Sequence, residues 1–141
     1  MIEYVKYEKR WKYPHMGPLD AAIWERFIEK FPNEFEQVAY DIAVGEGTPM
    51  DTVVSPDTGG DVNRLYQRRI DVVGVKGASV TIIECKPRAT TAAIGQIKGY
   101  ALLFARDFST AVGLKKVIVT DELMPEMKFL ADSEGVGIVV V

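Results

Sequence analysis

Hydrophobic and polar positions recur along this chain with two periods, one typical of helices and the other typical of strands. Over residues 18–31 the apolar side chains recur at helical spacing and cover roughly half of the wheel, and Pro32 ends the pattern. These apolar positions are Leu19, Ile23, Trp24, Phe27, Ile28 and Phe31. The pattern therefore predicts an amphipathic helix over residues 18–31.

The strongest strand signal lies in residues 68–75 and 79–86, which are rich in β-branched side chains and are separated only by residues 76–78. This arrangement predicts a β-hairpin. Apolar residues occupy both faces of both strands, as in a central strand pair that is covered on two sides. They are Ile70, Val72, Val73, Val80, Ile82, Ile83 and Cys85.

The turn of this hairpin decides which side chains meet. A two-residue type II′ turn at residues 77–78 pairs Lys76 with Ser79 and, by counting back, Asp71 with Glu84. Directly opposed side chains have Cβ atoms roughly 4.5–5.5 Å apart. A turn centred one residue earlier leaves the two carboxylates as diagonal neighbours on one face, and only a three-residue loop separates them.

The remaining elements follow from the same patterns. A strand is predicted at residues 35–44, a helix at 91–105 with Thr90 or Thr91 as its cap, and a strand at 116–120. A short helix over 125–132 ends near Gly135 and precedes a last strand over 136–141. Residues 45–67 form the longest loop, which we interpret either as a flap over a substrate groove or as a disordered insertion.

Composition limits the class of protein. With 141 residues and 48% hydrophobic content, the chain is expected to form one domain over residues 1–141. It has no run of about 18 apolar residues and no apolar segment typical of a signal peptide, so a cytoplasmic protein without a membrane anchor is expected. A single cysteine and a single histidine exclude an internal disulfide, a cysteine-based zinc site and a histidine-rich metal site.

Positive charge is concentrated in one segment, although the net charge of the chain is −3. Between residues 64 and 106 there are eight basic residues and only two acids, Asp71 and Glu84. A local basic patch can hold a phosphate backbone while the rest of the surface stays acidic. The candidate nucleic-acid-binding residues are Arg64, Arg68, Arg69, Arg88 and Lys98.

Two like charges that face each other on paired strands destabilise the sheet unless something positive lies between them. Magnesium is commonly held by one or two carboxylates, waters and phosphate oxygens, so Asp71 and Glu84 are a sufficient protein contribution to a Mg²⁺ or Mn²⁺ site. Period-two alternation places Lys86 beside Glu84 and turns Cys85 away, leaving the Cys85 carbonyl as a further ligand. The alternative is a surface ion cluster, but charges in so apolar a strand are costly unless a site requires them.

These residues resemble the signature of the PD-(D/E)XK nuclease superfamily, in which Asp71 and Glu84-Cys85-Lys86 match the motif and Ile70 replaces the proline. The resemblance implies an α/β, restriction-endonuclease-like fold: an α-β-β-β-α-β core with a central mixed sheet flanked by helices. It also implies that the acids bind the metal and that Lys86 positions the nucleophile.

Residues 96–100 match the Q-x-x-x-Y motif of the RecB-like exonuclease branch, with Gln96 and Tyr100 on one helix face. The resemblance implies that these two residues support the site or contact DNA; an ordinary amphipathic helix edge is the alternative. The small residues Ala92, Ala93, Gly95 and Gly99 are expected to let this helix approach the sheet closely. The superfamily often takes a third acid from the first helix, for which Glu25 is the candidate and a solvated charge the alternative.

The sequence therefore predicts a Mg²⁺- or Mn²⁺-dependent nuclease that hydrolyses DNA phosphodiesters by attack of a metal-activated water. A small endonuclease or a structure-specific, resolvase-like nuclease fits best, and a homodimer would complete its groove. The alternatives are a RecB-like DNA exonuclease and a catalytically silent module of the same fold that binds nucleic acid or a partner.

Overall fold

The computed structural model describes residues 1–46, 68–109 and 113–141. Its strands are β1 (Val5–Lys6), β2 (Gln37–Val44), β3 (Arg68–Lys76), β4 (Ser79–Arg88), β5 (Lys115–Glu122) and β6 (Gly137–Val140). Its helices are α1 (Pro18–Lys30), α3 (Thr91–Asp107) and α4 (Met127–Ser133). Most of the predicted loop at residues 45–67, including Arg64, lies outside the described residues.

The described strands form one six-stranded mixed sheet in the order β1-β2-β3-β4-β5-β6. The first four strands pair antiparallel, whereas β4–β5 and β5–β6 pair parallel. This confirms the α-β-β-β-α-β order and the central mixed sheet with flanking helices. The two-residue strand β1 was not predicted, because two residues on an edge carry too little periodic signal.

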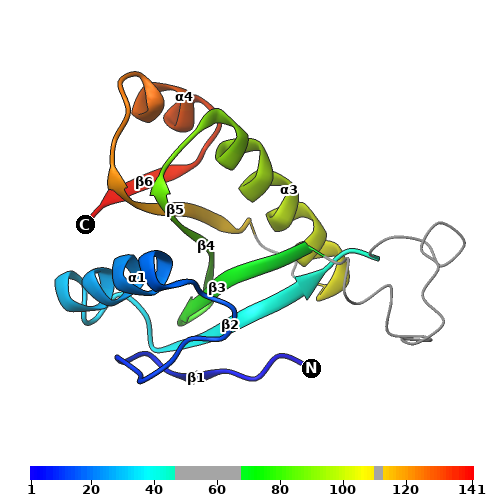
Figure 1. Cartoon of the computed structure of the whole chain (residues 1–141). Helices are drawn as coiled ribbons and strands as arrows, with labels where there is room; N and C mark the ends of the chain where they lie inside the picture. The colour runs from blue at the N-terminus through cyan, green and yellow to red at the C-terminus, as the bar shows by residue number, and fades with distance from the viewer. Residues whose placement is uncertain (47–67, 110–112) are drawn as a thin grey trace, which may run out of the picture.

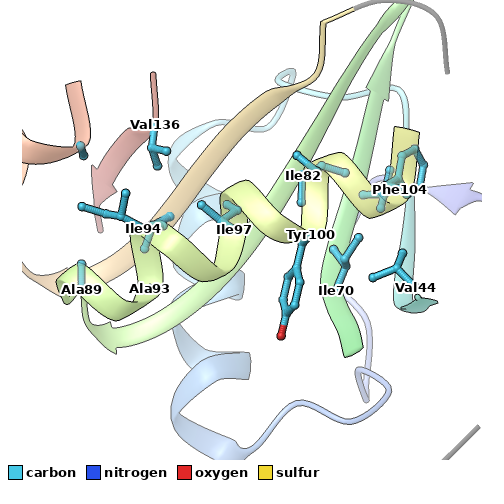
Figure 2. Packing of buried hydrophobic residues seen from close by; sticks show 14 of the residues in the cluster. Val44, Ile70, Ile82, Ala89, Ala93, Ile94, Ile97, Tyr100, Phe104 and Val136 are labelled. Carbon is cyan, nitrogen blue, oxygen red and sulfur yellow. The ribbon is translucent and has the colours of Figure 1, made fainter. Parts of the chain in front are cut away.

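Helices cover the two faces of the sheet (Figure 1). On one face, Trp24 and Phe27 of α1 pack against Val38 of β2 and other residues, in a cluster that we call the α1 core. On the other face, α3 and α4 enclose the α3 core, part of which is seen in Figure 2. Because both faces are covered, the middles of the central strands β3 and β4 are rich in buried apolar residues, and a charge there is a costly exception.

The helices begin and end close to the predicted positions. At the end of α1, the Phe31 amide donates to the Phe27 carbonyl at 2.9 Å. Leu19, predicted to be on the buried face, is 66% exposed, in the first turn of α1. Thr90 caps α3 by accepting a hydrogen bond from the Ala93 amide at 3.3 Å.

Candidate active site

The β3–β4 hairpin has the register that its turn predicts. Lys76 pairs with Ser79, and the ladder continues as far as Val72 opposite Ile83. Gly77 has a φ of 58°, the left-handed value that the first position of a type II′ turn requires. The ladder ends immediately before Asp71 and Glu84. From there β4 pairs only with β5, so β3 and β4 separate where the two carboxylates lie.

The carboxylates bridge the gap between the separating strands. The Cys85 amide donates to Asp71 Oδ2 at 3.0 Å, and the Asp71 amide donates to Glu84 Oε1 at 3.2 Å. The negative charge of Asp71 also acts on Glu84, because the two side chains lie side by side across the gap. Each carboxylate thus accepts a backbone hydrogen bond just past the end of the ladder, which fixes its position.

Burial dominates the electrostatics of the pair. Glu84 is only 3% exposed, and burial, followed by the negative charge of Asp71, raises its pKa to about 8. Burial also raises the pKa of Asp71, although the hydrogen bond from the Cys85 amide opposes the shift. The metal-free pair therefore holds a proton at neutral pH, where two ordinary carboxyls would hold none.

This shared proton predicts that the metal-free protein loses stability as pH rises from about 4.5 to about 8. In that window the folded protein keeps the Glu84 proton and the unfolded chain releases it, with a slope of at most ~1.4 kcal/mol per pH unit for one proton. Urea unfolding at several pH values measures the slope. Glu84→Gln should flatten the profile, whereas Glu3→Gln, at an exposed acid, should not; equal slopes in both variants would contradict the assignment.

Two further charged side chains face the pair. Lys86 is half-buried, and its positive charge opposes the raised pKa values of Asp71 and Glu84. From the first turn of α1, Asp20 adds a negative charge that raises the pKa of Asp71. Burial raises the pKa of Asp20 itself, and Lys86 opposes that shift. Asp20 and Lys86 are therefore the charged side chains outside the pair that act on Asp71.

Of the acids on α1, Asp20 is the one whose charge acts on Asp71, whereas the predicted role was for Glu25. Glu25 Oε1 accepts a hydrogen bond from the Tyr13 hydroxyl at 3.3 Å, and its part in catalysis stays a prediction. The helical wheel could place Glu25 at the edge of the apolar arc but could not give its height along the helix. A usable signal was present, because Asp20 precedes the buried residues Ile23, Trp24 and Phe27 at spacings of three, four and seven.

Gln96 and Tyr100 form a linked pair on α3. Gln96 Nε2 donates to the Tyr100 hydroxyl oxygen at 2.7 Å. The Tyr100 ring lies in the α3 core with its hydroxyl pointing out of the cluster (Figure 2). Burial raises the pKa of Tyr100, and the charge of Glu84 adds to the shift, so the hydroxyl stays protonated.

A groove of about 830 Å³ runs beside α3, with Arg68, Lys86 and Gln96 among its lining residues. Gly95 and Gly99 also line it, and a Cβ added at either would meet no atom within 4 Å. The small residues of α3 therefore open this groove, with only Ala93 fully buried against the core. The expected role of all four in close packing against the sheet was wrong, since packing needs just one side of the helix.

The predicted basic cluster does not stay together. Of its five residues, Arg68 lines the groove, and Arg64 lies outside the described part of the chain. The other three have acidic partners: Arg69 binds Asp41, Arg88 binds Glu122, and Lys98 binds Glu134. Among the four described residues of the cluster, only Arg68 lines this groove, and the phosphate-binding role of the cluster stays a prediction. The sequence shows charge density but not the acids that fold against it.

The donor chemistry of the site fits a hard divalent cation. Asp71 and Glu84 offer carboxylate oxygens, the ligands that Mg²⁺ and Mn²⁺ prefer, and a cation would replace the proton that burial forces on the pair. The Cys85 side chain is 2% exposed in the α1 core, so only its carbonyl could contribute. Within the described ranges, no group of three or more His, Cys, Asp or Glu side chains is close enough to bind a metal without waters or substrate.

Comparison with known proteins gives structural neighbours only. No family model and no curated protein matches the sequence. The chain resembles the solved EndoMS–double-stranded DNA complex with a TM-score of 0.50 and 14% identity, over 94% of this chain and 49% of that one. It resembles AF1548, described as a protein of unknown function, with a TM-score of 0.50 and 19% identity, over 80% of this chain and 52% of that one.

A repair endonuclease from Pyrococcus abyssi gives a TM-score of 0.49 at 16% identity, over 95% of this chain and 49% of that one. The chain thus spans about half the length of these solved chains. At such low identity the first two similarities establish a shared fold. No helix within the described residues is long and apolar enough to cross a membrane.

Proposed function

We propose that this chain is a metal-dependent nuclease that hydrolyses DNA phosphodiester bonds, as a small endonuclease of the PD-(D/E)XK type. The observation that carries the proposal is the carboxylate pair Asp71–Glu84, held across the opening between β3 and β4 with Lys86 beside it. Support comes from the fold, which is shared with an EndoMS chain solved in complex with double-stranded DNA. A purely structural ion cluster would not need two buried acids that repel each other.

The roles of the residues follow from their positions. Asp71 and Glu84 would hold Mg²⁺ or Mn²⁺, and a divalent cation supplies charge stabilisation to the phosphoryl group and acidifies water. Lys86 lines the groove beside the pair, where it can orient the attacking water or offset charge that develops on the phosphate. Gln96 lines the same groove from α3 and donates to the Tyr100 hydroxyl, which would in turn donate its own hydrogen to a substrate.

The test combines metal and DNA. Purified protein is incubated with supercoiled, linear and branched DNA in Mg²⁺, Mn²⁺ or EDTA, and its melting temperature is measured with each metal in the absence of DNA. We expect cleavage in Mg²⁺ or Mn²⁺ but not in EDTA, together with a higher melting temperature, because a cation binds the folded state alone. Absence of Mn²⁺ binding by calorimetry at millimolar concentration would remove the basis of the proposal.

The same substrates separate a second candidate. The Gln96–Tyr100 hydrogen bond is the observation that favours a RecB-like exonuclease. An exonuclease needs a free end and would degrade linear DNA while leaving covalently closed circles intact. Nicking or linearisation of supercoiled DNA would instead identify an endonuclease.

DNA binding should depend on Arg68 more than on Lys98. Arg68 lines the groove, whereas the Lys98 ammonium is bound to Glu134 at a different surface. Removing one phosphate contact lowers the slope of log affinity against log salt by roughly 1. We expect that decrease for Arg68→Ala and an unchanged slope for Lys98→Ala, measured by fluorescence anisotropy in Ca²⁺. A decrease in the Lys98 variant alone would place the DNA on the other side of α3.

A further inference from the structure

Strand β2 changes face in its middle. In a regular strand, residues two apart lie on the same face of the sheet. Here Val38 and Tyr40 pack in the α1 core, but Ile42 and Val44 pack in the α3 core on the opposite face. The alternation is therefore broken between Tyr40 and Ile42, at Asp41.

The alternation of side chains in strand β3 is broken at the same level of the sheet. Val72 packs in the α1 core, whereas Ile70, two residues earlier, packs in the α3 core, where Figure 2 shows it on the same side as Tyr100. The residue between them is Asp71. Because Tyr40 pairs with Val72 and Ile42 pairs with Ile70, Asp41 lies opposite Asp71 in the register. One irregularity thus crosses both strands at the proposed metal-binding acid.

The backbone of Asp41 explains where the irregularity begins. Its φ is 55°, in the left-handed region that non-glycine residues rarely adopt and that aspartate and asparagine tolerate best. A strand cannot keep its alternation through such a residue. Bulges and kinks of this kind commonly redirect a side chain beside an active site.

Arg69 holds Asp41 in this conformation. Arg69 Nε lies 2.5 Å from Asp41 Oδ1 and Nη2 lies 2.9 Å from Oδ2, a two-pronged contact from the neighbouring strand. The same Nη2 is 3.5 Å from the Asp41 carbonyl, and His15 Nε2 is 3.1 Å from Oδ2. The Asp41 side chain is only 11% exposed. Arg69 stands two residues before Asp71, so this contact joins β2 to β3 directly beside the break.

We propose that Asp41, held by Arg69, is a positioning residue for Asp71. Its left-handed backbone breaks the alternation of both strands and turns the Asp71 carboxylate into the gap toward β4. There the carboxylate accepts a hydrogen bond from the Cys85 amide and lies beside Glu84. The geometric part of this inference stands on the fold alone, and its consequence for cleavage rests on the proposed function. It also gives Arg69 a role other than binding phosphate.

The test is a substitution series at Asp41, ordered by tolerance of a left-handed backbone: Asn and Gly against Ala and Val. The first readout is hydrogen exchange of the Cys85 amide, which reports the position of Asp71 in the absence of any metal or DNA. We expect Asn and Gly to retain its protection and Ala and Val to lose roughly tenfold or more, the effect of one charge-assisted hydrogen bond. Gln37→Val, at an exposed position of β2, controls for a new valine in that strand and should change nothing.

The second readout is the cleavage rate with Mn²⁺, for which kcat should fall in the Ala and Val variants with little change in KM. If Asp41 acted only through its charge, Gly and Asn would fail as completely as Val, which would overturn the proposal. Equal protection of Cys85 in all four variants would overturn it as well. If the wild-type protein does not cleave DNA but Cys85 protection still follows the series, the proposed function fails and the positioning role stands. The Ala variant keeps the test decisive if the Val variant does not fold.

Discussion

Asp71→Asn and Glu84→Gln proteins are expected to lose metal-dependent cleavage by on the order of 10³-fold or more, because several kcal/mol of charge stabilisation leave with the cation. Both substitutions keep the size of the side chain and remove one of the two charges that a divalent cation would neutralise. Single-turnover cleavage and Mn²⁺ calorimetry on the same preparations give the two quantities to compare.

The same variants should behave in the opposite way without metal. Removing one acid ends the repulsion that, after burial, raises the pKa of Glu84 to about 8, so the metal-free variants should melt no lower than the wild type. Their melting temperatures should then no longer rise with Mn²⁺. Asp132→Asn, at an exposed acid on α4 that binds Lys128, is the matched control and should keep both cleavage and the metal effect. Wild-type Mn²⁺ affinity in the Asp71 variant would move the metal site elsewhere.

The second large effect is expected for Lys86→Ala, whose cleavage rate should fall by about 10²–10³-fold while its DNA affinity in Ca²⁺ changes little. Lys86 faces both carboxylates and lines the groove, so it can act on charge that develops only during the reaction. Rapid-quench kinetics and binding in Ca²⁺ separate the two quantities.

Lys116→Ala is the control for this prediction, since Lys116 is also half-buried but lies on β5 and donates to the Leu114 carbonyl. It should leave both rate and affinity unchanged. A parallel loss of rate and affinity in the Lys86 variant would make this residue an ordinary phosphate contact, and the catalytic assignment would fall.

Local patterns in the sequence were sufficient for the described helices, for every described strand except the two-residue β1, and for the central pair of acids. Apolar spacing located α1 and α3, and β-branched runs located β3 and β4, because these signals depend only on residues a few positions apart. The turn at Gly77 fixed the hairpin register, and the register brought Asp71 level with Glu84. The Gln96–Tyr100 contact followed in the same way from a spacing of four on one helix.

Tertiary structure decided which distant charges meet. Nothing local shows that Arg69 faces Asp41, 28 positions earlier in the chain, or that Lys98 faces Glu134, 36 positions later. That the charge of Asp20 acts on Asp71 depends on where along α1 the helix meets the sheet, which a helical wheel does not record. Long-range pairing of this kind is set by the packing of whole elements.

The sequence alone thus determined that two carboxylates and a lysine share one hairpin, because strand period and turn length are local properties. Their final orientation is not local. Regular alternation would place Ile70 and Val72 on the same face, and it is the left-handed Asp41 on the neighbouring strand that coincides with the change of face at Asp71. A positive φ at a non-glycine residue persists only where surrounding contacts enforce it, and those contacts exist only in the folded protein.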